Sequence, residues 1–187
     1  MSNEWYIIGL GNPGAKYRNT RHNAGFAALD EISRVFGIDM KVRGELEKGE
    51  GVIEAANVTL IKPLTYMNRS GSVVYSQVRY NTSQSIVIQD DVDMPVGRLK
   101  IKTGGGAGGH KGVLSIIETS GTRDFIRIKI GVGRDSIIPV DEYVLMRFPP
   151  GEAALIKETV AEVVRSAACI ISEGIAAAMN KFNKRPD

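Results

Sequence analysis

Short apolar runs alternate along this chain with longer segments in which apolar residues recur every three or four positions. The first run, WYIIGLG at residues 5–11, ends at an Asn-Pro-Gly turn signal, and residues 23–36 then keep helical spacing up to Gly37. A short apolar run closed by turn residues is typical of a buried strand, whereas the longer periodic segment is typical of an amphipathic helix. Alternation of this kind predicts an α/β fold.

The remaining segments continue the alternation. Strands are expected at residues 51–56, 58–62, 85–89, 98–102 and 125–132, and a tight turn at Asn57 joins the first two. Helices are expected at residues 70–80, 113–118 and 151–182, the last interrupted at Gly174. We therefore expect residues 1–187 to form a single domain, a three-layer α/β/α arrangement in which helices flank both faces of a mixed central sheet.

The composition limits the class of protein. With 43% hydrophobic and 24% charged residues, the chain has enough apolar side chains for a core and is not of a disordered class. Its formal net charge of +3 is mildly basic, so nucleic-acid binding must be argued from where the charges lie. The N-terminus lacks the basic segment of a signal peptide, and no apolar run has the length of a membrane span. We expect a cytoplasmic protein without a membrane partner.

Two glycine-rich segments resemble nucleotide-binding motifs but lack essential parts. GLGNPG at residues 9–14 fits G-x-G-x-x-G, yet polar residues 15–21 separate it from the helix that should begin within the glycines. In GGGAGGHKG at residues 104–112, Lys111 does not follow glycine and Gly112 stands where a P-loop has Ser or Thr. A nucleotide-dependent oxidoreductase is thus an alternative that rests on the glycines alone, and we expect no cofactor.

The two histidines of the chain lie where α/β sheets bind ligands. His22 follows the turn after the first strand, in the crevice beyond the strand ends, and His110 ends a loop rich in glycine. Asp90 comes directly after the apolar strand at residues 85–89. There it can accept a hydrogen bond from His22 and stabilise the imidazolium that forms when His22 takes a proton, although a solvated acidic turn is the alternative. No His/Cys cluster has metal-ligand spacing, so no metal is expected.

Amides and cations complete the set of candidate residues. Asn12 and Asn68 each follow a strand end, where they are either turn residues or, as donor and acceptor, groups that hold a peptide carbonyl or an oxyanion. Two strands carry cations at every second position, which places the cations on one face; they are Arg98, Lys100 and Lys102, and Arg127 and Lys129. The alternatives are a solvated sheet edge and a phosphate-binding surface, and two such rows around one glycine-rich loop favour the second.

Together these residues resemble the bacterial peptidyl-tRNA hydrolase family. The matching segments are GLGNPGAKYRNTRHNAG (9–25), KPLTYMNRSG (62–71), VIQDDVDMPVGRLKIKTGGGAGGHKG (87–112), IKIGVGR (128–134) and AMNKFN (178–183). The resemblance implies a monomeric enzyme of translation, with neither metal nor cofactor, that hydrolyses the ester between a peptide and the 3′-terminal ribose of tRNA. RNA-binding splicing factors of plant organelles, which keep the fold without needing turnover, are the alternative within this resemblance.

The resemblance also implies a role for each site residue. His22 is the general base, Asp90 keeps it basic and oriented, and Asn12 separates peptidyl-tRNA from free aminoacyl-tRNA by binding the peptide. Further residues are expected to contact the substrate or the tRNA: Tyr17, Tyr66, Asn68, Lys102, His110, Lys111 and Lys129. The family usually has Asn at the position of Lys111, and because an ammonium has three donors and no acceptor, the departure puts the usual role of that position in doubt.

Overall fold

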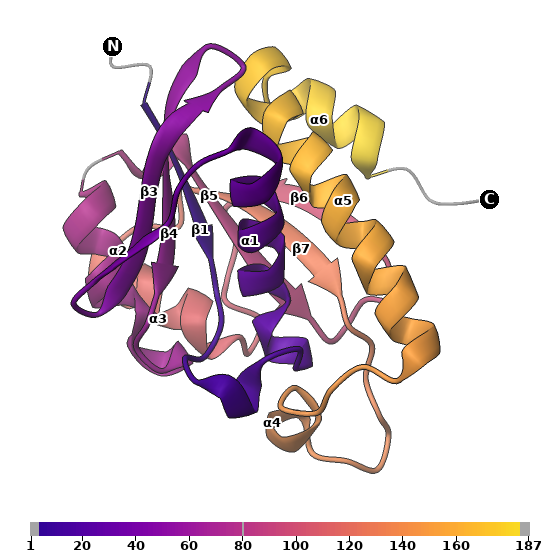
Figure 1. The fold of residues 1–187 in the computed structure, drawn as a ribbon. Coiled ribbons are helices and arrows are strands. Elements are labelled where there is room, and N and C mark those ends of the chain that lie inside the picture. Colours follow the sequence, from indigo (N-terminus) through magenta and orange to yellow (C-terminus); the bar gives the residue numbers. More distant parts are fainter. Residues whose placement is uncertain (1–3, 80, 184–187) are drawn as a thin grey trace.

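The computed structural model describes residues 4–79 and 81–183. Its centre is a seven-stranded sheet in the order β2-β3-β4-β1-β5-β7-β6 (Figure 1). The strands are β1 (Glu4–Gly9), β2 (Lys41–Arg43), β3 (Leu46–Ile53), β4 (Ala56–Pro63), β5 (Ser85–Asp91), β6 (Leu99–Thr103) and β7 (Ile126–Gly131). Strands β4, β1, β5 and β7 are parallel, and the other three pair antiparallel with their neighbours. The mixed sheet predicted from the sequence is confirmed.

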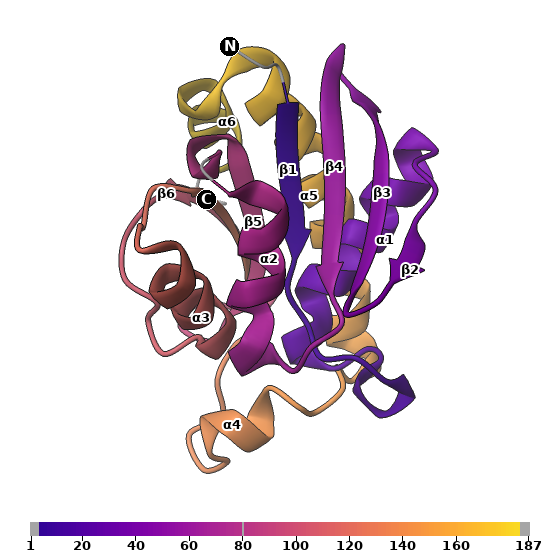
Figure 2. The ribbon, with the colours of Figure 1, turned by 90° about the vertical axis from the view of Figure 1, so that its left-hand side faces the viewer.

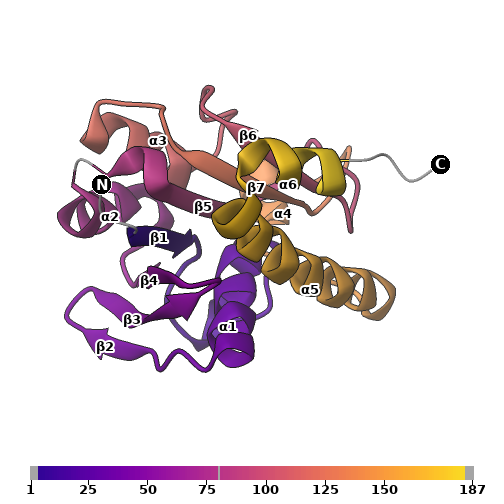
Figure 3. The ribbon, with the colours of Figure 1, turned by 90° about the horizontal axis from the view of Figure 1, so that it is seen from above.

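Helices form a layer on each face of the sheet (Figures 1 and 3). α1 (Ala24–Phe36) and α5 (Pro150–Glu173) cover one face, and α2 (Ser70–Val78) and α3 (Lys111–Ser120) cover the other. α6 (Ile175–Phe182) follows the break at Gly174, and the short α4 (Val140–Tyr143) lies beyond the sheet, below it in Figure 1. Among the described residues no helix combines the length and the hydropathy needed to cross a membrane.

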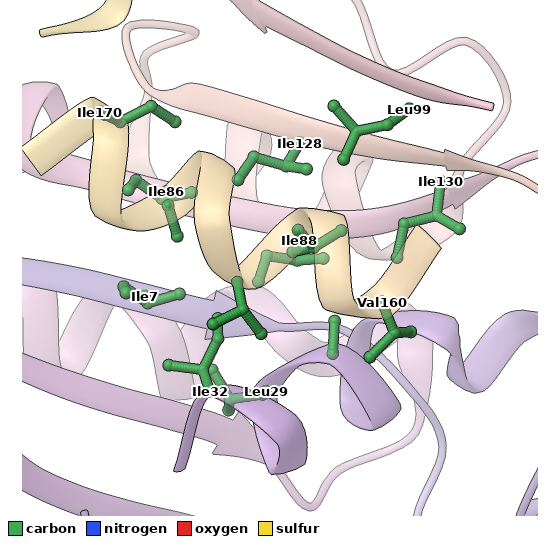
Figure 4. Close-up of a cluster of buried hydrophobic side chains, with 14 of the residues drawn as sticks. Ile7, Leu29, Ile32, Ile86, Ile88, Leu99, Ile128, Ile130, Val160 and Ile170 are labelled. Atoms are coloured by element: carbon green, nitrogen blue, oxygen red, sulfur yellow. The ribbon is translucent and has the colours of Figure 1, made fainter. Parts of the chain in front are cut away.

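Alternation along β5 shows why both layers form. Ile86 and Ile88 are fully buried in the cluster under α1 and α5, which also holds Leu29 and Ile32 (Figure 4). Val87 belongs to the cluster under α2 and α3. Because a strand directs successive side chains to opposite faces, the uninterrupted apolar run at residues 86–88 fits a sheet that is covered on both faces. Each such side chain contributes roughly 1.5–3 kcal/mol when fully buried.

The face that α2 and α3 cover is apolar over only part of its width. On β7 the residues that alternate with the buried isoleucines are Arg127 and Lys129, and on β6 they are Lys100 and Lys102. The apolar cluster under α2 and α3 contains no residue of β6 among those described. The part of this face that β6 and β7 form is therefore polar. In Figure 2, which looks at the molecule from the side, α2 and α3 lie in front of the sheet.

The predicted turn before β4 was wrong, two short elements were not predicted, and one helix ends earlier than predicted. The turn between β3 and β4 is Glu54–Ala55, both with positive φ, and Asn57 lies within β4 opposite Val52. Two-residue hairpin turns need such backbone angles, which Asn-Gly normally marks, and no such signal stands here. The exposed strand β2 and the four-residue α4 have no apolar pattern long enough to predict them. α2 ends at Val78, and residue 80 of the predicted helix lies outside the described residues.

Candidate active site

His22 is held at the carboxyl end of the sheet by close backbone packing. It lies in a short 3-10 helix, η2 (Arg21–Asn23), that leads into α1. A Cβ on Gly25 would lie 2.5 Å from the carbonyl oxygen of Ile88, so only glycine lets α1 begin this close to the end of β5. The backbone N–H of His22 donates to the carbonyl of Val144 at 2.8 Å. The backbone that carries the His22 ring is therefore held by β5 and by the segment at Val144.

Asp90, near the end of β5, lies beside the His22 ring. Nδ1 of His22 is 2.9 Å from each carboxylate oxygen of Asp90, which is the contact expected from the sequence. Burial by itself would raise the pKa of the Asp90 carboxyl, but the imidazoles of His22 and His110 lower it by more, so the pKa lies well below its usual value. Asp90 is thus a carboxylate, and its oxygens only accept hydrogen bonds.

His110 is a second partner of the same carboxylate, which the sequence did not reveal. Its Nε2 is 2.9 Å from Oδ1 of Asp90. Its Nδ1 accepts from the backbone N–H groups of Gly112 at 3.2 Å and Val113 at 3.3 Å, and so caps the start of α3. The helix begins at Lys111, two residues before the predicted start, because His110 is its N-cap. Both ring nitrogens of His110 therefore have protein partners.

These contacts assign the proton on the neutral His22 ring. Because the Asp90 carboxylate only accepts, Nδ1 of His22 must donate to it. The neutral ring then has a lone pair on Nε2, and His22 lines the cleft. An imidazole with one nitrogen held by a carboxylate and the other free to accept a proton is the arrangement of a general base.

His22, Asp90 and His110 are also side chains of the kinds that ligate metal ions, and their ligand atoms lie within 4.8 Å of one another. The fold brings together residues that are far apart in the sequence. Each imidazole N–H has the carboxylate as its acceptor, and the other nitrogen of His110 is used by the α3 backbone. A metal ion would have to displace both N–H···O contacts. The cluster is therefore a hydrogen-bonded unit around one buried carboxylate.

Asn12 is oriented by two residues that approach it from either side. Its backbone N–H donates to Oδ1 of Asn23 at 2.9 Å, and Nδ2 of Asn23 donates back to its carbonyl at 3.0 Å. Its side-chain oxygen accepts from the backbone N–H of Met67 at 2.8 Å. The Asn12 amide can therefore offer its Nδ2 donor to a ligand in the cleft that Asn12 lines. Asn23, the residue after His22, was missed as a site residue.

The site opens into a cleft of about 980 Å³. Its lining includes Asn12, His22, Tyr66, Asn68, Lys102, His110, Lys111, Lys129, Val140, Val144 and Leu145. Tyr17 does not line this cleft. Its ring packs edge-to-face against Tyr66, with centroids 6.5 Å apart, and so supports Tyr66 at the rim.

The two rows of cations differ in their surroundings. Arg127 is fully buried, so it is not the surface cation that was predicted. Its guanidinium donates to the side chain of Gln89 at 2.8 Å and to the carbonyl of Gly106 at 2.7 Å, and it thereby fixes the glycine-rich loop. Lys129 pairs with Asp91. Burial lowers the pKa of Lys102, and the charges of Arg127, Lys129 and Lys100 lower it further. A nearby anion would relieve this repulsion.

Known proteins resemble the chain over nearly its whole length. A family model described as peptidyl-tRNA hydrolase matches residues 6–187. A Thermodesulfovibrio yellowstonii protein named peptidyl-tRNA hydrolase is 49% identical over 95% of this chain and 98% of its own length, and one from Clostridium botulinum is 45% identical over 95% and 94%. A crystal structure of peptidyl-tRNA hydrolase from Acinetobacter baumannii matches with a TM-score of 0.92 and 34% identity, covering 98% of this chain and 96% of that one.

Proposed function

Since the chain belongs to the peptidyl-tRNA hydrolase family, we propose that it hydrolyses the ester that joins a peptide to the 3′-terminal ribose of tRNA. The observation that supports this most directly is the His22 ring, whose Nδ1 is held by Asp90 while the ring lines the cleft. The products are free tRNA and free peptide, so the reaction recycles tRNA from aborted translation.

The chemistry follows from this arrangement. Nε2 of His22 takes a proton from a water molecule, and the resulting hydroxide attacks the ester carbonyl carbon. Asp90 stabilises the imidazolium across the 2.9 Å contacts. When the tetrahedral intermediate collapses, the bond from the carbonyl carbon to the ribose oxygen breaks and the imidazolium returns the proton to that oxygen. Donors from Asn12 and Asn68 stabilise the negative oxygen of the intermediate.

Asn12 is proposed to recognise the peptide. Its side-chain oxygen is occupied by Met67, so its Nδ2 is a donor of fixed direction. A donor fits the carbonyl of a peptide group. A free aminoacyl-tRNA has no such carbonyl next to the esterified residue and carries an ammonium group, which repels a donor. The orientation of Asn12 therefore supports selection of peptidyl-tRNA over aminoacyl-tRNA.

The cations of the cleft are proposed to bind tRNA phosphates. Lys102, Lys111 and Lys129 all line the cleft, and Lys129 is partly neutralised by Asp91. Lys111 is exposed at the start of α3, where an ammonium can contact a phosphate but cannot accept a hydrogen bond as an Asn can. Tyr66 is proposed to line the substrate channel, with the Tyr17 ring packed against it. Action as a monomeric single domain in the cytoplasm stays a prediction.

A hydrolysis assay separates this function from RNA binding without turnover. N-acetylated aminoacyl-tRNA, labelled in the amino acid, is the substrate, and the same aminoacyl-tRNA without the acetyl group is the matched control. We expect release of the label from the first and little from the second. Tight binding of both with release from neither would support the binding-only alternative and contradict the proposal.

A further inference from the structure

We propose that His110 is a positioning residue, held by α3 in one neutral tautomer, that donates to Asp90 and so limits how strongly this carboxylate holds a proton on His22. The inference replaces the substrate-binding role expected for His110 and rests on the proposed role of His22 as the base. It stands on three observations: the bonds of each ring nitrogen of His110, the burial of Asp90, and the sharing of one carboxylate by two imidazoles.

The start of α3 determines the tautomer of His110. Nδ1 accepts from two backbone N–H groups, those of Gly112 and Val113, so it carries no proton. The single proton of the neutral ring is then on Nε2, which lies 2.9 Å from Oδ1 of Asp90. Protonating Nδ1 would break both capping bonds and place a cation at the positive end of the helix dipole. These contacts therefore assign the proton of the neutral His110 ring to Nε2, facing Asp90.

The Asp90 carboxylate accepts hydrogen bonds from two imidazole donors. It is 2% exposed, so bulk water hardly reaches it. His22 approaches both of its oxygens, and His110 shares Oδ1 with it. A hydrogen bond to the charged form of a carboxylate stabilises that form and weakens its pull on another proton. Donation from His110 thus leaves His22 a weaker base than it would be beside an unshared carboxylate.

Other charged groups lie around the pair but do not contact it. The same cleft is lined by Lys111 of α3, Lys102 of β6, Arg127 and Lys129 of β7, Asp91 and Asp93 at the end of β5, and Arg134 and Asp141 near α4. Of these, Lys129 pairs with Asp91 and Arg134 with Asp93. Within residues 4–79 and 81–183, Asp90 is the one acid at ion-pair distance from either imidazole. It is therefore the group through which His110 can act on His22.

The geometry also argues against direct contact of His110 with substrate. The residue is 9% exposed, and each of its ring nitrogens already has a partner in the protein. A hydrogen bond to tRNA or peptide would require one of these contacts to break.

Two substitutions separate the remaining roles of the ring. His110→Asn keeps an acceptor near Nδ1 for the α3 cap and removes the Asp90 donor, whereas His110→Gln keeps a donor near Nε2 and removes the cap.

The experiment is nitrogen NMR of the full chain labelled with ¹⁵N-histidine, titrated with pH. The chain has two histidines, and His110→Asn removes one set of signals, which assigns the other. We expect His110 to stay neutral with its proton on Nε2 while His22 titrates. We expect His110→Asn to move the titration of His22 to higher pH, and His110→Gln to leave it where it is in the wild type.

The acidic limb of the kcat/KM profile should move to higher pH in His110→Asn and stay in place in His110→Gln, with tRNA affinity unchanged in both. A His110 that titrates, a proton on its Nδ1, an unmoved His22 in His110→Asn, or equal shifts in both variants would overturn the inference. The NMR arm needs no turnover. If the chain hydrolyses no peptidyl-tRNA, the proposed function fails while the tautomers and the coupling are still read.

Discussion

The proton positions around Asp90 decide how a single substitution there should act. Asp90→Asn keeps the shape of the side chain but removes the charge that stabilises the His22 imidazolium. The pKa of His22 should fall, so the acidic limb of the kcat/KM profile should move to lower pH, with a loss of rate on the order of 10²-fold at neutral pH. This direction is opposite to that expected for His110→Asn.

Asp93→Asn is the matched control for this change. Asp93 lies in the same segment and lines the same cleft, but its carboxylate pairs with Arg134 and does not contact either histidine. Its acidic limb should stay in place. If Asp90→Asn leaves the limb where it is, or moves it to higher pH, Asp90 does not act on the base in the way proposed.

Lys102 is the cation whose surroundings most favour an added anion. Lys102→Glu should weaken tRNA binding and flatten the dependence of log affinity on log salt by about 0.9 for each lost duplex-like phosphate contact. Lys157→Glu makes the same change in net charge on α5, which covers the opposite face of the sheet, and should leave that slope unchanged. Titrations of tRNA at several salt concentrations measure both. Equal slopes for the two variants would remove Lys102 from the tRNA contact surface.

At the scale of elements, the segment that carries His22 is tied to the segment after α4. The backbone N–H of Arg21 donates to the carbonyl of Met146 at 3.0 Å, and Nη1 of Arg21 is 2.6 Å from a carboxylate oxygen of Glu152 at the start of α5. The Arg21 guanidinium also lies over the rings of Tyr143 and Phe148, at 4.3 Å and 4.8 Å. Arg21 thus joins η2, α4 and α5 beside the base.

Removing this cation should cost both stability and rate. Arg21→Met leaves Glu152 without its partner, and we expect the free energy of unfolding to fall by about 1–3 kcal/mol because the arginine is buried. Arg34→Met breaks an exposed pair with Glu31 and should cost less than about 1 kcal/mol. Denaturant unfolding measures both. Equal losses, or an unchanged kcat in Arg21→Met, would show that η2 is held without Arg21.

The elements that could be predicted from the sequence are those whose pattern comes from burial. β1 and β5 each contain an uninterrupted apolar run, at residues 5–8 and 86–88, because helices cover both faces of the sheet. α1 keeps its apolar spacing for the same reason. β2 has three exposed residues, and the β3–β4 turn relies on positive φ at ordinary residues, so neither has a signal in the sequence.

The position of the site and the His22–Asp90 contact could be predicted, but its other contacts could not. His22 and Asp90 were placed at strand ends, and the sheet topology brings strand ends together. The second partner of Asp90 depends on how α3 is capped, 20 residues further along the chain. Arg127 has the alternation of a surface cation, and it is buried because the glycine-rich loop folds back over it. Such contacts depend on tertiary packing that local patterns do not record.

At the scale of the whole molecule, the cleft is lined by basic side chains from one part of the chain and by apolar side chains from another. The polar face of β6 and β7 contributes Lys102 and Lys129. α4 contributes Val140, and the two residues that follow α4 contribute Val144 and Leu145. A basic wall suits a nucleic-acid backbone and an apolar wall suits the side chains of a peptide. His22 lines the same cleft. This arrangement fits a substrate in which an ester links a tRNA to a peptide.

The most direct test of the proposed mechanism is His22→Ala. Single-turnover hydrolysis of N-acetylated aminoacyl-tRNA should fall by at least about 10²–10⁴-fold, while equilibrium binding of the same substrate stays within about threefold, less than 1.4 kcal/mol. Because His22 and Asp90 serve one proton transfer, adding Asp90→Asn should cause little further loss. Hydrolysis by His22→Ala at close to the wild-type rate would contradict the mechanism.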